Sequence, residues 1–299
     1  MFQWIVFPRP EGIRCLVICN HGKTVSRKRN GQILHRSFQS PFPGGHRRSC
    51  DPSSLTVLDC VFQSYTIDTF FIIDVLLWNG MNFVDQDVDF RFAWIRDRSR
   101  ELDPVASGSH FSFVEPRFPC SNFDVIAQCY NHFEDDTKFG FRQDGILFYH
   151  RKGIYEMGHS PLTLIWKDSF CCPYFVDTDG VSISSTLIAS CRIHPDRSVR
   201  TLDDIIIGSF AEQICGSDPL RFCNSHGLAK FSIPHLKEIE GRPMVDHLTY
   251  LGKCSEARRY PDSWSKIRFQ FDARLGRTIS VADFQQFFLG KRESIMDYH

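Results

Sequence analysis

The sequence lacks an excess of charge of either sign, because 35 Lys and Arg residues balance 35 Asp and Glu residues. Broad, sequence-independent binding to nucleic acid depends on a surplus of cations, so the zero net charge argues against that mode of binding. A confined site for a small charged or aromatic ligand is compatible with a neutral chain.

The 12 cysteines include no C-x-x-C pair, which argues against a zinc ribbon or finger. The N-terminal stretch MFQWIVFPRP has neither the basic start nor the apolar run of a secretory signal. No segment approaches the ~20 apolar residues of a membrane-spanning helix. We therefore expect free thiols in a reducing compartment, most of them acting as small core residues, and no cofactor.

Aromatic residues are abundant, with 28 Phe in 299 residues, and this composition favours β-structure. Short apolar segments separated by Gly, Pro, Asn or Asp predict consecutive strands. In the first half these segments are 3–7, 14–19, 32–38, 54–63, 69–79, 90–97, 145–151 and 161–167. Asn30-Gly31 predicts a hairpin turn, and the polar residues 97–110 predict a loop.

The second half alternates short strand candidates with polar loops, the strands being predicted at 180–188, 203–211, 220–224, 228–233 and 247–253. Helical spacing and capping residues predict helices over 121–133, 260–276 and 280–293. We expect an α+β fold of mostly antiparallel strands with few helices. We also expect three parts: a core over 1–168, a β-rich elaboration over 169–260 and C-terminal helices over 261–299.

The stretch PRPEGIRCLVI, residues 8–18, places three charged residues in a break between two apolar strands. It opens an ordered series that continues with FIIDVLLWNG, QDGILFYHRK and PLTLIWK. This order resembles the nucleotidyltransferase fold of messenger-RNA capping guanylyltransferases and polynucleotide ligases. The resemblance implies a nucleophilic lysine at position 9, where this sequence has Arg9. A guanidinium, with a pKa above ~12, stays protonated and is not a nucleophile.

The later motifs of that fold match less evenly. Lys167 stands at the final motif, whereas Asp74 matches the strand acid only loosely. We therefore expect no covalent nucleotide transfer and no catalytic residue. A degenerate guanylyltransferase or ligase remains an alternative, and so does a cap-blind interaction scaffold that uses residues 169–260.

Several stretches in residues 2–168 resemble the cap-binding domain of the snurportin family, above all FPGGHRR, DFRFAWI and DGILFYH. Snurportins bind the trimethylguanosine (m3G) cap of spliceosomal U small nuclear RNAs and carry the particles into the nucleus. The resemblance implies a non-enzymatic cap binder that shuttles between nucleus and cytoplasm. The family's basic importin-beta-binding region and its Leu-Ser-x-Trp segment precede the domain, and this chain starts after both, so we do not carry receptor binding over.

The resemblance also suggests site residues. Trp166 matches the tryptophan that stacks on the methylated guanine, and a core role is its alternative. A methylated, positively charged base stacks well on an indole, through a cation–π contact worth ~1–2 kcal/mol. Arg14 and Arg29 match basic phosphate contacts, with an ion pair to Glu11 or a solvated hairpin face as the alternatives. The expected cap-binding set is completed by Ile13, Cys15 and Lys167.

Overall fold

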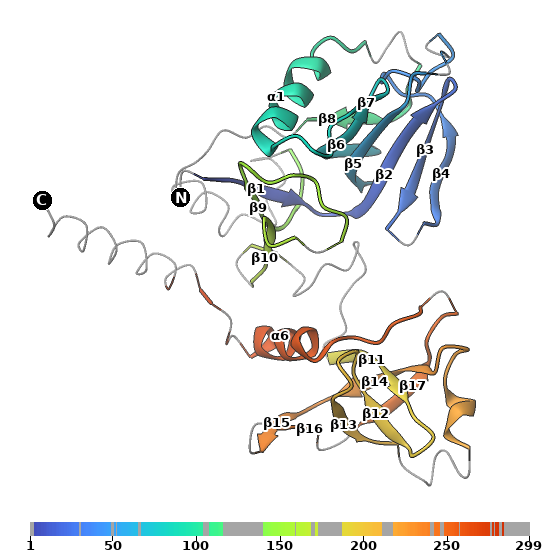
Figure 1. Ribbon diagram of the computed structural model, residues 1–299, viewed down its shortest axis with the longest axis vertical. Helices are drawn as coiled ribbons and strands as arrows, with labels where there is room; N and C mark the ends of the chain where they lie inside the picture. The colour runs from blue at the N-terminus through green and yellow to red at the C-terminus, as the bar shows by residue number, and fades with distance from the viewer. Residues whose placement is uncertain are drawn as a thin grey trace, which may run out of the picture. The chain divides into compact units, whose positions relative to one another are not determined.

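The computed structural model contains two compact units, Met1–Ser182 and Ile183–His299 (Figure 1). Within these units the structure describes residues 3–29, 31–48, 51, 53–64, 67–103, 108–115, 140–158, 160–168, 171–172, 187–210, 218–239, 242–245, 248–256, 258–275, 277, 279–280 and 283. Each unit has its own sheets and its own hydrophobic core.

The first unit is built on a seven-stranded sheet with the order β4-β3-β2-β5-β6-β7, to which β8 adds a parallel pairing with β6. Neighbouring strands along the rest of the order pair antiparallel. The strands are β2 (Ile13–Asn20), β3 (Lys23–Lys28), β4 (Ile33–Phe38), β5 (Thr56–Gln63), β6 (Thr69–Trp78), β7 (Met81–Asn82) and β8 (Ser112–Val114). The apolar run of β6 is buried along nearly its whole length, as a central strand with two covered faces requires.

A second, three-stranded sheet in the same unit has the order β1-β9-β10 and consists of β1 (Trp4–Pro10), β9 (Gln143–His150) and β10 (Thr163–Trp166). Within this sheet, Phe7 of β1 stacks on Tyr149 of β9 at 5.5 Å between ring centroids, and both side chains belong to the core that it shares with the larger sheet. Val61 and Ile73 contribute to the same core from β5 and β6. The two sheets thus enclose one core, and the segments flanking β1 and β9 lie at its margin.

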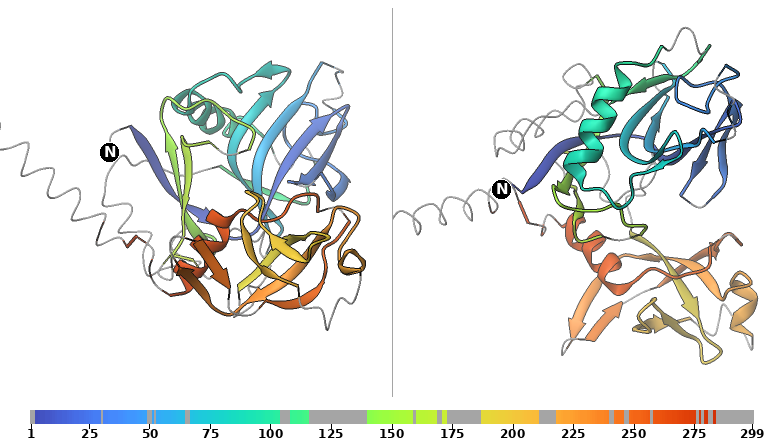
Figure 2. Two further views of the ribbon diagram at one scale, coloured as in Figure 1. Left: turned by 60° about the horizontal axis from the view of Figure 1, so that its bottom comes forward. Right: turned by 45° about the horizontal axis from the view of Figure 1, so that its top comes forward.

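Helix α1 (Val88–Ser99) corrects the strand predicted over 90–97 and the start of the loop predicted over 97–110. The Asp87 carboxylate caps it by accepting a hydrogen bond from the Phe90 amide at 2.9 Å. Arg91 and Ile95 are buried one turn apart, the spacing of one helix face, so an aromatic-rich segment forms a helix rather than a strand. The views in Figure 2 show α1 as the long helix beside the strands of this unit.

The predicted hairpin at Asn30-Gly31 is confirmed, because β3 and β4 pair antiparallel and Gly31 has φ +83°. The other predicted turn, FPGGHRR, is held against the sheet. A Cβ on Gly44 would lie 2.0 Å from the Ser54 carbonyl oxygen, so only glycine fits there. This close approach fixes the loop that carries Arg47 and Arg48 beside β3.

The second unit contains a five-stranded antiparallel sheet in the order β13-β12-β11-β14-β17, a separate hairpin and helix α6 (Trp264–Arg274). Its strands are β11 (Leu187–Ile193), β12 (Ser198–Arg200), β13 (Ile206–Ser209), β14 (Leu228–Ile233) and β17 (Thr249–Lys253), with β15 (Leu236–Ile239) and β16 (Arg242–Val245) in the hairpin. Ile267 of α6 packs into the core of the sheet. The Ser263 hydroxyl caps this helix, which confirms the helix predicted over 260–276 with shorter ends.

The remaining predictions divide in three ways. The strand predicted at 220–224 is wrong, because Pro219–Phe222 form a 3-10 turn (η1) capped by Asp218. The helix over 121–133 lies outside the described residues, as does nearly all of the helix over 280–293. The α+β class with mostly antiparallel strands is confirmed, whereas the division at 168 and 260 stays a prediction.

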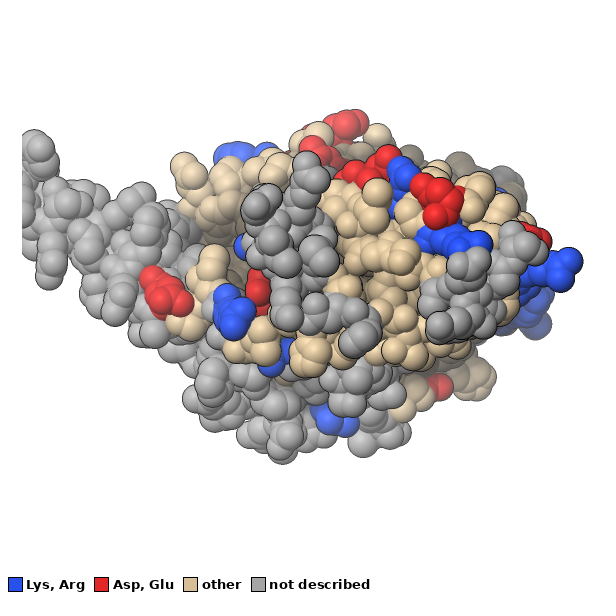
Figure 3. Space-filling model, turned by 90° about the horizontal axis from the view of Figure 1, so that it is seen from below, with Lys and Arg blue, Asp and Glu red and all other residues tan. Residues whose placement is uncertain are grey.

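The surface charge agrees with the equal numbers of basic and acidic residues in the sequence. On the face drawn in Figure 3, the basic and acidic side chains lie interspersed rather than gathered by sign. Among the described residues no helix is long and apolar enough to cross a membrane. Within the same residues no three His, Cys, Asp or Glu side chains form a cluster suited to a metal ion.

Candidate functional site: the β1–β2 loop and strand β10

The β1–β2 loop contains the PRPEGIR stretch, and a glycine fixes its path. Gly12 has φ +145°, and a Cβ there would lie 2.2 Å from the Phe62 carbonyl oxygen of β5. The side-chain amide of Gln63 donates to the Glu11 carbonyl at 2.9 Å, which ties the loop to the same strand. The Glu11 carboxylate lies 3.5 Å from Nε of Arg142. The loop is therefore packed against β5 and not a free surface turn.

A buried group of three charges joins the three strands of the smaller sheet. Asp144 on β9 is fully buried, and its carboxylate bridges Nη1 of Arg9 on β1 and Nζ of Lys167, the latter at 2.6 Å. Arg9 also donates to the Pro10 carbonyl at 3.1 Å. Two cations therefore share one buried carboxylate directly after β10. Breaking one of these buried pairs would cost about 3–5 kcal/mol, because the carboxylate or the cation would lose its partner.

Gly145 makes the approach of the last strand possible. It has φ +99°, and a Cβ there would lie 2.7 Å from the Trp166 carbonyl oxygen and 3.0 Å from Cγ of Lys167. The Asp-Gly pair of β9 is thus not a turn, as the dipeptide alone suggests. Its aspartate holds the cations, and its glycine admits β10 beside them.

Arg14 on β2 forms a two-pronged ion pair with Asp59 on β5, with Nε–Oδ1 at 3.1 Å and Nη2–Oδ2 at 2.6 Å. The hydroxyl of Tyr155 donates to the same carboxylate at 2.8 Å. Asp59 is 2% exposed and Arg14 23% exposed, so the pair lies at the edge of the core. The charge of Asp59 raises the pKa of Arg14. Burial raises the pKa of Tyr155, and the charge of Asp59 adds to that shift. This pair corrects the alternative of an ion pair between Arg14 and Glu11, because the β2–β5 register brings Asp59 to Arg14.

Asp74 is a structural acid in this fold. Its carboxylate accepts from Nε and Nη2 of Arg91 at 2.7 and 2.9 Å, and both residues are 1% exposed. Nη1 of Arg91 also donates to the carbonyl of Gly153 at 3.1 Å. Burial raises the pKa of Asp74, and the bonds to Arg91 oppose that shift. The pair joins α1, β6 and the segment after β9, which leaves the carboxylate no room to act on a ligand.

Trp166 is the last residue of β10 and is half-buried. Its indole Nε1 donates to Oδ2 of Asp168 at 2.9 Å, and its ring lies 6.4 Å from that of Phe148 with a tilt of 36°. Lys167 follows Trp166 directly but is buried against Asp144, whereas Trp166 lies beside Phe148. The indole is therefore oriented at its edge by Asp168 and placed one residue from the buried cations.

The other predicted site residues lie along β2 and the β3–β4 turn. Ile13 is partly buried and pairs with Phe62, whereas Cys15 is 2% exposed and packs in the core of the larger sheet. Cys15 pairs with Lys28, and Arg29 follows that pair at the same end of the strands as Arg14. The structure thus places Arg14 and Arg29 at one end of β2 and β3, and Trp166 with Lys167 on the smaller sheet.

Sequence reasoning missed two side chains that touch the predicted set, Asp59 and Tyr155. The signal for Asp59 is visible in the sequence as a lone acid in the apolar segment 54–63. A buried carboxylate in a strand requires a cation partner, so the segment calls for an arginine on a neighbouring strand. Tyr155 carries no such signal, because its contact depends on the path of the segment after β9.

Comparison with known proteins shows that residues 1–167 match the family described as Snurportin1, m3G cap-binding domain. Among solved structures, a mycobacterial DNA ligase D complexed with ATP and MES is similar at 14% identity, with a TM-score of 0.39, covering 83% of this chain and 89% of that one. The ligase domain from M. tuberculosis LigD matches at 14% identity and a TM-score of 0.39, covering 84% and 88%. A Lig E DNA ligase matches at 13% identity and a TM-score of 0.34, covering 84% and 92%. The family match spans more than half of the chain, which therefore belongs to the Snurportin1 m3G cap-binding domain family.

Proposed function

We propose that the first unit binds the trimethylguanosine cap of U small nuclear RNAs without catalysing a reaction. The observation that carries the proposal is the position of Trp166. Its indole Nε1 donates to Asp168 at 2.9 Å, and the next residue, Lys167, belongs to the buried ion-pair group with Asp144 and Arg9. A fixed aromatic ring beside cations suits a ligand that joins a cationic base to a phosphate bridge.

The proposed roles follow from the contacts of each residue. Trp166 stacks on the methylated guanine, and Arg14 and Arg29 contact the phosphate bridge. Asp59 accepts from Nε and Nη2 of Arg14, which fixes the orientation of the guanidinium at the edge of the core. Lys167 contributes through its ion pair with Asp144, and Ile13 and Cys15 support Arg14 from the opposite face of β2, where Cys15 packs in the core.

The absence of catalysis is part of the proposal and rests on Arg9. The family resemblance places a lysine nucleophile at this position in the transferases and ligases. The Arg9 guanidinium is instead buried and bonded to Asp144. Because a guanidinium keeps its proton, it cannot attack a phosphoryl group. A degenerate transferase would form a covalent protein–nucleotide adduct with a radiolabelled nucleoside triphosphate and divalent metal, and we expect none.

Titration with cap dinucleotides tests the proposal directly. Trimethylguanosine cap should quench tryptophan fluorescence of the full chain, and monomethylguanosine cap serves as the comparison. Trp166→Ala should remove most of the quenching, whereas Trp264→Phe, a change on α6 in the second unit, should leave the binding curve intact. If neither cap binds, the proposal is wrong and a cap-blind scaffold is favoured.

The adaptor role in nuclear import is a further part of the proposal. It implies that the chain binds capped U snRNA particles and shuttles between nucleus and cytoplasm. Support comes only from family membership over residues 1–167. Localisation of the tagged chain, together with its recovery on immobilised importin-beta, tests this part separately. A chain that binds cap but never enters the nucleus would limit the function to cap binding.

A further inference from the structure

The strand order of the second unit is that of a nucleic-acid-binding barrel. If β11, β12, β13, β14 and β17 are counted as strands one to five, the observed order β13-β12-β11-β14-β17 reads 3-2-1-4-5. All four pairings are antiparallel. This is the order of the five-stranded OB fold, in which the face of strands two and three and the loops 1–2 and 4–5 contact oligonucleotides. A shared order alone assigns no ligand, and the side chains on that face decide what it can bind.

Three cations lie in a row on strands four, one and two of the sheet, and this row meets the face of strands two and three at Arg200. Arg192 on β11 pairs directly with Arg200 on β12, and Lys230 on β14 pairs with Ser190, two residues before Arg192 on the same face. Like charges placed directly opposite destabilise a sheet. Arg200 is held by Asp196 at 3.1 Å and Asp204 at 3.2 Å. Within the described part of the chain, neither Arg192 nor Lys230 has a carboxylate within ion-pair distance, so the row carries an excess of positive charge.

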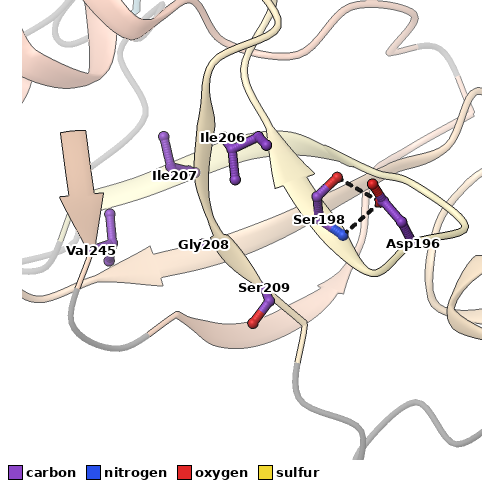
Figure 4. A pocket seen from close by; sticks show the side chains of 7 residues that line it. All are labelled: Asp196, Ser198, Ile206, Ile207, Gly208, Ser209 and Val245. Carbon is purple, nitrogen blue, oxygen red and sulfur yellow. Dashed lines mark hydrogen bonds between the residues drawn. The ribbon is translucent and has the colours of Figure 1, made fainter. Parts of the chain in front are cut away.

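A hollow of about 360 Å³ adjoins this row on strands two and three. Figure 4 shows its lining, to which β12 contributes Ser198, β13 contributes Ile206 to Ser209, the 1–2 loop contributes Asp196 and the hairpin after strand four contributes Val245. Ile206 is 53% exposed. Nε of Arg200 donates to the Ser198 hydroxyl at 2.8 Å, which shows that the cationic row and the hollow share one face.

We propose that this face of the second unit binds a single-stranded RNA segment. Phosphates lie on the row Lys230–Arg192–Arg200, and a base enters the hollow against Ile206 and Val245. The row spans roughly 10 Å, since neighbouring strands are about 4.8 Å apart, so it reaches beyond a single phosphate. Serine hydroxyls and the Asp196 carboxylate supply partners for the polar edge of a base. The inference does not depend on the proposed cap site.

Two features define the kind of RNA binding expected. Arg200 is already neutralised by two aspartates, so Arg192 and Lys230 supply most of the attraction. A small number of phosphate contacts predicts modest affinity with a shallow salt dependence. The apolar hollow favours an unpaired strand over a duplex, because the bases of a duplex are stacked and unavailable.

The test uses the full chain and a fluorescein-labelled, uncapped oligouridine of about 12 nucleotides, which exceeds the smallest site of a single OB fold, with binding followed by anisotropy. We expect the wild type to bind at low salt, and the double variant Arg192→Glu/Lys230→Glu to bind at least tenfold more weakly. Lys23→Glu makes the same charge change at an exposed position on β3 of the first unit, outside this face, and should alter binding less than twofold. The milder pair Arg192→Gln/Lys230→Gln replaces the charge reversal if that protein does not fold.

Three outcomes overturn the inference: no binding by the wild type, equal loss in the Lys23→Glu control, or equal binding of polyglutamate of matched charge. The last outcome would assign the face to an acidic peptide. Trimethylguanosine cap dinucleotide is titrated into the same variants as a separate readout. Retained cap binding with lost oligouridine binding supports the inference. Loss of cap binding alone would bear on the cap proposal and leave this one standing.

Discussion

Asp59 provides the sharpest test of how the first unit orients Arg14, the cation that we propose contacts the cap phosphates. The substitution Asp59→Asn keeps the shape of the side chain but replaces one carboxylate oxygen with an NH2 group. In the structure both oxygens accept from Arg14, at 3.1 and 2.6 Å, and one also accepts from Tyr155 at 2.8 Å. In the variant, the new NH2 group therefore faces the donors of Arg14 and Tyr155, and the negative charge that pairs with Arg14 is lost.

The size of the effect follows from burial. Removing one partner of a buried ion pair costs about 3–5 kcal/mol, because the remaining charge is left without compensation. Arg14 is 23% exposed, so water recovers part of this loss, and we expect the free energy of unfolding to fall by about 2–3 kcal/mol. Cap binding should weaken roughly tenfold, or ~1.4 kcal/mol, because the guanidinium is no longer held in one orientation.

Urea unfolding followed by tryptophan fluorescence measures the first effect, since four of the five tryptophans, at positions 4, 78, 94 and 166, lie in the first unit. The matched control is Asp97→Asn in the same unit, the same change at the Arg96 ion pair, whose aspartate is 59% exposed, and it should cost about 0–1 kcal/mol. If Asp59→Asn has the same free energy of unfolding and the same cap affinity as the wild type, the assigned role of Asp59 is refuted.

Two further predictions concern the first unit. Gly145→Ala should destabilise the protein far more than Gly140→Ala. Both glycines have positive φ, but only a Cβ added at Gly145 would clash, at 2.7 Å from the Trp166 carbonyl oxygen. The difference between the urea midpoints of the two variants measures the effect of this clash. Burial lowers the pKa of His35, which sits among phenylalanines, so the unfolded chain takes up the proton first. The free energy of unfolding should therefore be highest above the ordinary pKa of ~6.5 and fall as the pH drops through that value. His35→Gln should make this fall smaller when unfolding is measured at about pH 7.5 and 5.5. An unchanged difference between the two pH values would contradict the prediction.

Much of the first unit could be predicted from the sequence, because its strands are short, apolar and separated by strong breaks. The hairpin at Asn30-Gly31 needed no tertiary information, since the turn chemistry alone specifies it. The segment 90–97 failed for a physical reason. Its aromatic residues suit a strand by composition, but the Asp87 cap and the burial of Arg91 beside Asp74 select a helix. Tertiary contact decided between the two.

The candidate site was likewise only partly predictable from the sequence. The family resemblance predicted Arg14, Trp166 and Lys167 as site residues, yet the sequence could not show that Lys167 pairs with the buried Asp144. Nor could it show that Arg14 pairs with Asp59, 45 residues away, because that contact depends on which strands become neighbours. The strand order of the second unit was equally hidden, since no local pattern specifies the pairing of distant strands.

The Arg9–Asp144–Lys167 group has one more consequence, which concerns time and pH rather than geometry. A lysine nucleophile must become neutral before it attacks, so the charge beside its ligand alternates during each reaction cycle. The Arg9 guanidinium keeps its charge under all physiological conditions. The charge at position 9 is therefore constant, and its ion pair with Asp144 does not depend on a change of protonation at Arg9. What serves as a switch in a transferase acts here as a permanent anchor.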